Sequence, residues 1–124
     1  GGELSRISLA IQLEASAKTR VPTMIFDEVD SGVGGAIAEV VGKKLQSLGT
    51  EAQVFCVTHL PQVAACGHHH FQVNKTKSSD KTTTSLKTLK ADQRVDEIAR
   101  MLGGKTITEQ TRRHAEEMLE LLTR

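Results

Sequence analysis

The stretch Thr23-Met24-Ile25-Phe26-Asp27-Glu28 decides the fold. Residues 23–26 form a short apolar run, and two carboxylates follow it at once. Such a run predicts a strand covered on both faces, as in a parallel sheet. A second strand of the same kind is predicted over residues 53–57, and it ends in Thr58-His59-Leu60-Pro61. The two runs therefore predict neighbouring parallel strands that each end in polar residues.

Helical patterns surround these two strands. Residues 3–17 carry a wide apolar stripe that includes Leu4, Ile7 and Ile11, so we expect this helix to be well buried. A glycine-rich loop over residues 30–35 precedes a second helix, which is expected to end at Gly49. The apolar positions of that helix are Ile37, Val40, Val41, Leu45 and Leu48.

The second half of the chain predicts a hairpin followed by two helices. Pro61 favours a short helix through about residue 66, and residues 70–73 alternate in polarity like a strand. Residues 75–84 are polar and predict a solvated hairpin loop, with a return strand over residues 83–89. Two amphipathic helices then follow, separated by Gly103-Gly104. This order predicts an α/β fold, mainly a parallel sheet with helices and an antiparallel edge hairpin.

Composition narrows the class of protein. The chain has 124 residues, which corresponds to one domain or part of one, and it begins without Met, as expected of a piece of something longer. Sixteen basic and fifteen acidic residues give a net charge of +1, which excludes a nucleic-acid module that acts through global charge alone. Three Phe with no Trp or Tyr argue against a base-stacking platform. No apolar run approaches the roughly 20 residues that span a bilayer.

Asp27 and Glu28 are the first candidates for chemistry. Carboxylates at the carboxyl end of a parallel strand lie where α/β sheets place ligands. Asp27 offers the hard oxygen that Mg²⁺ prefers, and Glu28 is able to orient or deprotonate a water. The alternative, which the pair alone favours, is a solvated loop that simply begins after the strand.

Two further candidates are suited to phosphate. Gly1-Gly2-Glu3 precedes a helix, so its backbone N–H groups and the helix dipole favour an anion, although this feature alone is better explained by a flexible chain end. His59 follows the second strand and is placed to donate to a γ-phosphate, or else it is a loop histidine bonded to backbone.

A histidine cluster and a lysine cluster are weaker candidates for binding sites. His68-His69-His70 alternates in direction on an extended chain, so even with Cys56 and Cys66 nearby a metal site is not favoured. Five lysines make the hairpin basic, with Asp80 as the acidic residue inside it. The lysines either touch a phosphate backbone or protect exposed strand edges against aggregation. They are Lys75, Lys77, Lys81, Lys87 and Lys90.

The order of these motifs resembles the C-terminal half of an ABC-type ATPase head of the SMC-like class, a P-loop NTPase. Gly1-Gly2-Glu3 is similar to the end of the signature motif, and residues 24–28 are similar to Walker B with its catalytic glutamate. Residues 29–32 resemble the D-loop, and His59 stands where the switch histidine belongs. Thr58-His59-Leu60-Pro61-Gln62 in particular resembles the bacterial DNA-repair members of this class.

The resemblance implies that residues 1–124 form a single C-terminal lobe without a second domain. No G-x-x-x-x-G-K-[ST] sequence occurs in the chain, and the signature serine that should precede Gly1 is absent. The fold is therefore expected to be incomplete without an N-terminal Walker A half of the same protein. The other expected partners are a second head, in an ATP-sandwich homodimer, and DNA. The expected location is the bacterial cytoplasm, associated with the nucleoid and not with a membrane.

The resemblance also implies a role for each site residue, with ATP and Mg²⁺ as cofactors. Asp27 would support Mg²⁺ through water, Glu28 would position the attacking water, and His59 would contact the γ-phosphate. The signature and D-loop residues would bind or couple to nucleotide across the dimer. These residues are Gly1, Gly2, Glu3, Asp30 and Ser31.

The implied function is ATP binding and hydrolysis in DNA double-strand-break repair and recombination, with no activity expected of the chain alone. Two alternatives stay open. One is a non-catalytic DNA- or protein-binding module, and the other is a head lobe of another SMC-like ATPase.

Overall fold

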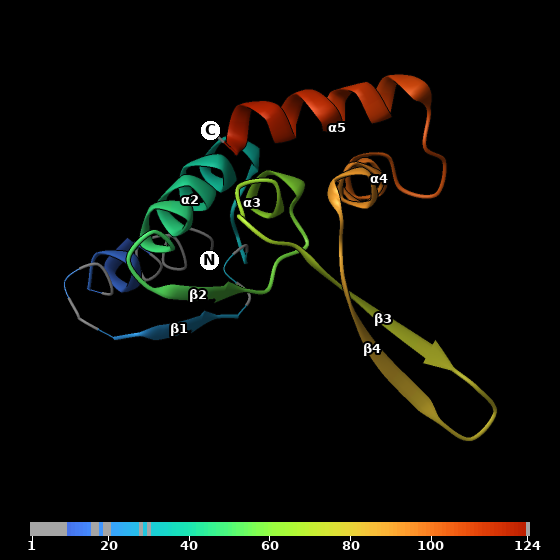
Figure 1. The fold of residues 1–124 in the computed structure, drawn as a ribbon, viewed down its shortest axis with the longest axis horizontal. Helices are drawn as coiled ribbons and strands as arrows, with labels where there is room; N and C mark the ends of the chain where they lie inside the picture. The colour runs from blue at the N-terminus through green and yellow to red at the C-terminus, as the bar shows by residue number, and fades with distance from the viewer. Residues whose placement is uncertain (1–9, 16–17, 19–20, 28, 30, 124) are drawn as a thin grey trace.

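The computed structural model describes residues 10–15, 18, 21–27, 29 and 31–123 (Figure 1). Residues 10–15 are helical. The further elements in chain order are β1 (Thr23–Phe26), α2 (Gly35–Leu48), β2 (Gln53–Cys56), α3 (Pro61–Ala64), β3 (Phe71–Lys77), β4 (Thr82–Thr88), α4 (Ala91–Gly103) and α5 (Glu109–Leu122). None of the described helices is long and apolar enough to cross a membrane.

β1 and β2 pair in parallel, as the apolar runs predict. Phe26 lies opposite Cys56, and α2 connects the two strands as a crossover. Phe26 is buried against α2 in a core that also contains Leu13, Val29 and Val63. One face of this sheet is therefore covered by α2.

The opposite face of the sheet is open. Ile25 and Val57 are 72% and 57% exposed, and Phe55, which lies opposite Ile25 in the ladder, is also exposed. The prediction that both faces are covered is wrong for the part of the chain that the structure describes. The reason is that no described element packs on this side, so apolar side chains typical of a buried strand meet solvent.

The predicted apolar stripes are confirmed in part. In α2 the buried residues are Ala38, Val41, Gly42, Leu45 and Leu48, and Gly49 ends the helix as predicted. Ile37 and Val40 lie outside this stripe and are exposed. In the helical segment 10–15, Leu13 is buried, but Ile11 is exposed, so the prediction of a well-buried helix fails there. Leu4 and Ile7 lie outside the described residues.

α2 also holds the ends of two other helices. A Cβ at Gly42 would lie 2.7 Å from the Cys66 sulfur, so glycine permits α2 to approach the turn that follows α3. The Gln46 side-chain amide donates to Cys66 O at 2.8 Å and to Leu122 O at 2.7 Å. Lys43 Nζ donates to the same Leu122 carbonyl at 2.9 Å. These bonds fasten the C-terminal end of α5 to the helix that covers the sheet.

A second core lies between α3, α4 and α5. Ile98 and Ala99 of α4 are fully buried, together with Ala115 of α5. As predicted, Gly104 ends α4, and its φ of 72° is the left-handed conformation that favours glycine. Thr108 caps α5, since its hydroxyl accepts from Thr111 N at 3.1 Å.

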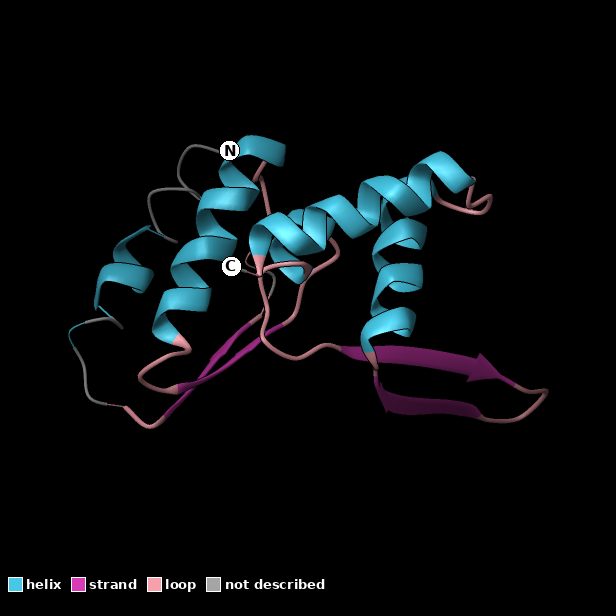
Figure 2. Cartoon of the chain, turned by 45° about the horizontal axis from the view of Figure 1, so that its top comes forward, coloured by secondary structure: helices cyan, strands magenta, loops and turns pink. Residues whose placement is uncertain are grey.

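β3 and β4 form an antiparallel hairpin that is a sheet of its own. Val73 lies opposite Leu86, and within the described chain the hairpin does not pair with β1 or β2. The α/β class is confirmed, but the hairpin projects away from the helices instead of forming the edge of the parallel sheet (Figures 1 and 2). β3 extends further than predicted, because residues 75–77 also pair across the ladder, whereas β4 nearly matches the predicted return strand over residues 83–89. The connecting loop is only 78–81.

Candidate functional site

Asp27 and the loop that carries His59 lie at the same edge of the parallel sheet. The register places Phe26 beside Cys56, and Val57 N donates to Phe26 O at 2.9 Å, so the pairing continues to the ends of both strands. Asp27 follows directly and is exposed, and His59 is exposed two residues beyond Val57. The structure therefore confirms that these side chains stand at the carboxyl edge, where open α/β sheets bind ligands.

The turn that presents His59 is fixed locally. Leu60 N donates to the Thr58 hydroxyl at 3.0 Å, which closes a short turn around His59. Pro61 is buried at the start of α3, where its ring suits the first helical turn. The apolar and proline residues on the C-terminal side of His59 thus anchor the loop.

The glycine-rich loop leaves the same edge. Val29 is buried beside Phe26 in the core, and Ser31 is exposed in the turn that follows. Gly32 has a φ of 72°, a conformation that side chains rarely adopt. The loop then reaches the start of α2 at Gly35. This geometry presents Ser31 outward from an anchored base.

The remaining candidates, Gly1, Gly2, Glu3, Glu28 and Asp30, lie outside the described residues. Their roles stay predictions from sequence.

The donor chemistry fits a nucleotide-bound Mg²⁺ only in part. An exposed Asp27 carboxylate is a suitable oxygen ligand, and Mg²⁺ in nucleotide sites takes one or two carboxylates together with substrate phosphates. Among the described residues, no group of three His, Cys, Asp or Glu side chains is placed to hold a metal ion. The described residues therefore suit a Mg²⁺ ion that is already coordinated by nucleotide phosphates. They do not form a complete binding site for a free ion.

Cys66 behaves as a structural thiol. Its Sγ donates to Gln62 O at 3.3 Å, and burial raises the pKa of the Cys66 thiol. A raised pKa disfavours the thiolate, which is the form that reacts and binds metal. The described part of the molecule gives no support to a histidine and cysteine metal site around His68-His69-His70.

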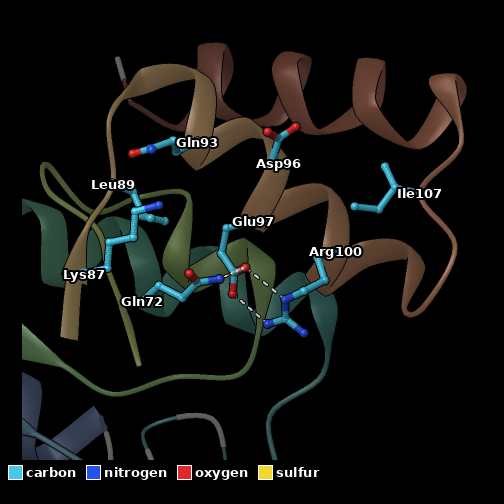
Figure 3. Close-up of a pocket in the computed structure, with 8 residues that line it drawn as sticks. All are labelled: Gln72, Lys87, Leu89, Gln93, Asp96, Glu97, Arg100 and Ile107. Carbon is cyan, nitrogen blue, oxygen red and sulfur yellow. Dashed lines mark hydrogen bonds and ion pairs between the residues drawn. The ribbon is translucent and has the colours of Figure 1, made fainter. Parts of the chain in front are cut away.

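Sequence reasoning missed a polar joint at the base of the hairpin. A shallow hollow of about 290 Å³ lies between the hairpin and α4 (Figure 3). Its lining residues are Gln72, Lys87, Leu89, Gln93, Asp96, Glu97, Arg100 and Ile107. The sequence signal was the three-residue spacing of Glu97 and Arg100 on a helix, which brings their side chains together.

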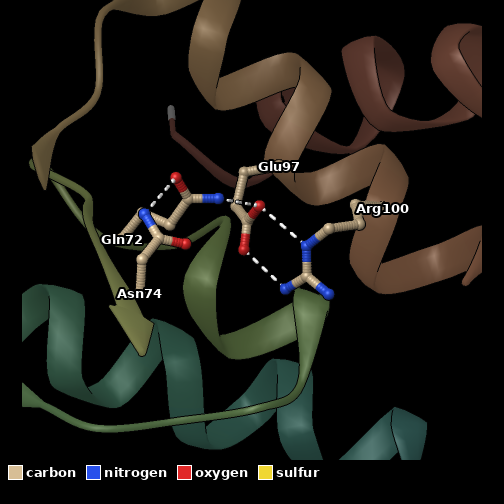
Figure 4. A network of polar contacts seen from close by, with 4 residues as sticks. All are labelled: Gln72, Asn74, Glu97 and Arg100. Atoms are coloured by element: carbon tan, nitrogen blue, oxygen red, sulfur yellow. Dashed lines mark hydrogen bonds and ion pairs between the residues drawn. The ribbon is translucent and has the colours of Figure 1, made fainter. Parts of the chain in front are cut away.

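Glu97 is the centre of this joint and is only 7% exposed. It accepts from Arg100 Nε at 2.9 Å, from Arg100 Nη2 at 2.6 Å and from Gln72 Nε2 at 2.6 Å (Figure 4). Asn74 in turn donates to Gln72 Oε1 at 3.3 Å. The Glu97 carboxylate thus connects β3 to α4, and its two oxygens accept hydrogen bonds from Gln72 and Arg100.

We expect Glu97→Gln to destabilise the chain by about 1–2 kcal/mol at pH 7, because it removes a charge-assisted pair from a buried site. Hydrogen bonding from Arg100 holds the pKa of Glu97 below its ordinary value of 4.5. This stabilisation is therefore present above pH 4.5 and is lost as the pH falls through the lower folded-state pKa. Urea unfolding across pH should show a shallower acid loss for Glu97→Gln than for the parent chain.

The matched control for this experiment is Glu117→Gln, which makes the same change at an exposed position of α5. It should leave the acid slope unchanged. An equal slope for all three chains would show that Glu97 is not linked to folding.

Three relatives of this chain share the same name. No model of a known protein family matches the chain. It is 55% identical over 119 residues to the DNA repair protein RecN of Vibrio cholerae, and 54% identical over 122 residues to that of Haemophilus influenzae. The Bacillus subtilis DNA repair protein RecN is 44% identical over 120 residues. These matches cover 96–98% of this chain but 21–22% of each relative, so the chain spans about a fifth of their length.

A solved structure shows the same fold. It comes from work on ATP-driven dimerization and DNA-stimulated activation of SMC ATPases, and it superposes with a TM-score of 0.67 at 15% identity. The match covers 86% of this chain and 63% of that one. The expected SMC-type head fold is therefore confirmed. The names of the relatives favour a RecN-like segment over a head lobe of another SMC-like ATPase.

Proposed function

We propose that this chain, a RecN-like segment with the fold of an SMC ATPase head, binds and hydrolyses ATP as one lobe of that head in bacterial DNA repair. The observation that carries the proposal is the meeting of Asp27 and the His59 loop at one edge of a parallel sheet. The fold of the structural neighbour and the names of the sequence relatives support it.

Three side chains at this edge would act on one nucleotide. Asp27 would hold Mg²⁺ through water, and Glu28, next in sequence, would orient the attacking water and accept its proton. His59 would donate a hydrogen bond to the γ-phosphate. Mg²⁺ would neutralise charge that develops on the phosphate oxygens. The protein's own part is therefore positioning and proton transfer, both of which depend on the rigid ends of β1 and β2.

Other residues would serve a second head. Gly1, Gly2 and Glu3, at the end of the signature motif, would contact a nucleotide held by the opposite head. Asp30 and the exposed Ser31 would couple the two sites. ATP would thus close a homodimer of heads, and hydrolysis would open it. The structural neighbour belongs to work on ATP-driven dimerization, which supports this assembly here.

The open face of the sheet supports a Walker A lobe as partner. Ile25, Phe55 and Val57 expose a continuous apolar strip on the side that no described element covers. Such strips mark contact surfaces on folded proteins. The Walker A lobe would also supply the phosphate-binding loop and lysine that this sequence lacks. We place the assembled head in the bacterial cytoplasm, at the nucleoid.

Reconstitution tests the proposal. We expect no ATP hydrolysis from this chain alone, because it has no Walker A loop to hold the phosphates. Mixing it with the Walker A-bearing N-terminal half of a RecN-like protein should restore turnover, measured as phosphate release, while each half alone stays at background. An associated, folded mixture without activity would contradict the catalytic assignment. Micromolar binding of an ATP analogue by this chain alone would instead contradict the expectation that it holds no nucleotide without a Walker A loop.

A further inference from the structure

The hairpin carries a net positive charge, whereas the rest of the chain has a net negative charge. Residues 71–90 contain five lysines and one acidic residue, Asp80, which gives this segment a net charge of +4. The whole chain has a net charge of +1, so the residues outside the hairpin carry −3. A polyanion that approached this lobe would therefore be attracted by the hairpin and repelled elsewhere.

The strand register gathers the donors on one face. Lys75 lies opposite Thr84, and Lys77 lies opposite Thr82. Residues opposite each other and residues two apart share a face of a strand pair, so these four side chains project together. The two lysines are about 6.6–6.8 Å apart along the strand. Among the described residues, neither lysine forms an ion pair, so their charges are available to a ligand.

Protection of the strand edges does not explain this arrangement. The exposed apolar residues of the hairpin, Phe71, Val73 and Leu86, stand at its base. Lys75 and Lys77 lie beyond them toward the tip, where the opposite strand is a run of three threonines, 82–84, without an apolar side chain. Lys87, opposite Gln72, already stands at the base beside these apolar residues, where a lysine protects against aggregation, so Lys75 and Lys77 are not needed for that purpose. At the tip they join hydroxyl groups, and this combination is typical of phosphate contacts.

The base of the hairpin is held firmly. Gln72 donates to Glu97 of α4, which Arg100 binds through two nitrogens (Figure 4). From this joint the hairpin extends away from the helices, with its tip clear of the rest of the described chain (Figures 1 and 2). The lysines are thus presented at the end of an arm with a defined direction.

We infer that the face formed by Lys75, Lys77, Thr82 and Thr84 binds the phosphate backbone of duplex DNA without regard to sequence. The choice of DNA among polyanions rests on the proposed function. The charge and geometry of the face do not depend on that function. Phosphate contacts carry no sequence information and depend strongly on salt. The hairpin would therefore be a DNA-contact arm separate from the ATP site.

The test is the salt dependence of DNA binding by a full-length RecN-like protein that carries this chain, measured by anisotropy of a labelled duplex. The double variant Lys75→Gln and Lys77→Gln should weaken binding at least about tenfold at about 0.1 M salt. It should also reduce the slope of log K against log salt by about 1.8, since each lost phosphate contact removes about 0.9. Two duplexes of unrelated sequence should give the same result.

The matched control is Lys18→Gln with Lys105→Gln, which removes the same charge from exposed positions outside the hairpin. The control pair should leave affinity and slope close to the parent values. An equal loss in both pairs would assign binding to overall charge and overturn the proposal, as would an unchanged slope in the hairpin pair. ATP hydrolysis without DNA, measured on the same samples, should be unchanged by the hairpin pair, which separates this test from that of the proposed function.

Discussion

Glu28→Gln should abolish ATP hydrolysis by the reconstituted head while leaving ATP binding intact. Asp27, the preceding residue, is exposed at the carboxyl edge of β1, where the nucleotide is proposed to lie. Glu28, next in sequence, is proposed to accept a proton from the attacking water, and glutamine has almost the same shape but cannot accept that proton. General-base removal typically costs about 10²–10⁴ in rate. We expect a loss of this size in phosphate release.

The control for this variant is Glu51→Gln, which neutralises an exposed carboxylate in the turn after α2. It should retain the activity of the parent mixture. Binding of a fluorescent ATP analogue separates the two possible defects, because Glu28→Gln should bind as well as the parent. Full turnover by Glu28→Gln would remove Glu28 from the mechanism.

Arg94→Leu should cause the largest loss of stability in the C-terminal part of the chain, about 3 kcal/mol. Arg94 Nη2 donates to Ala64 O at 3.0 Å, to Ala65 O at 3.2 Å and also to Gly67 O. These carbonyls surround the end of α3, the helix that follows the His59 loop. One guanidinium on α4 therefore fastens the second core to α3. Leucine fills the space but leaves the carbonyls without their donor. Urea unfolding should report the loss.

Two further variants test whether hydrogen bonding causes this loss. Arg94→Lys keeps a charge and a donor, so it should recover part of the stability but not all of it, since an ammonium lacks the planar fork. Arg113→Leu alters an exposed arginine of α5 whose ion pair with Glu109 is 3.6 Å long, and it should be nearly neutral. Equal stability of the parent and Arg94→Leu would show that the clamp is not needed for folding.

The joint beside Arg94 shows what sequence reasoning found and what it missed. The three-residue spacing of Glu97 and Arg100 was readable on a predicted helix, but Gln72 is 25 residues away from Glu97 in sequence. His70 lies near the same place, where burial and the neighbouring Arg94 charge lower the pKa of the imidazole. These contacts arise because the hairpin brings β3 back beside α4, and no local pattern encodes which residues of α4 then face Gln72.

The local elements and the order of the motifs follow from the sequence alone. Continuous apolar runs placed β1 and β2, and Gly49 and Gly104 placed helix ends, because turn chemistry depends on near neighbours. The sequence also placed Asp27 and His59 after consecutive parallel strands, whose ends must share an edge.

The covered apolar surfaces and the direction of the hairpin, in contrast, depend on packing between distant segments. An isoleucine such as Ile25 looks equally suited to a buried strand whether or not a partner is present, and here it is exposed. The hairpin strands alternate as an edge would, yet they form a separate arm fixed by Gln72 and Glu97. The physical reason is that burial and long-range polar contacts depend on packing between distant segments, whereas strand, turn and cap preferences are set locally.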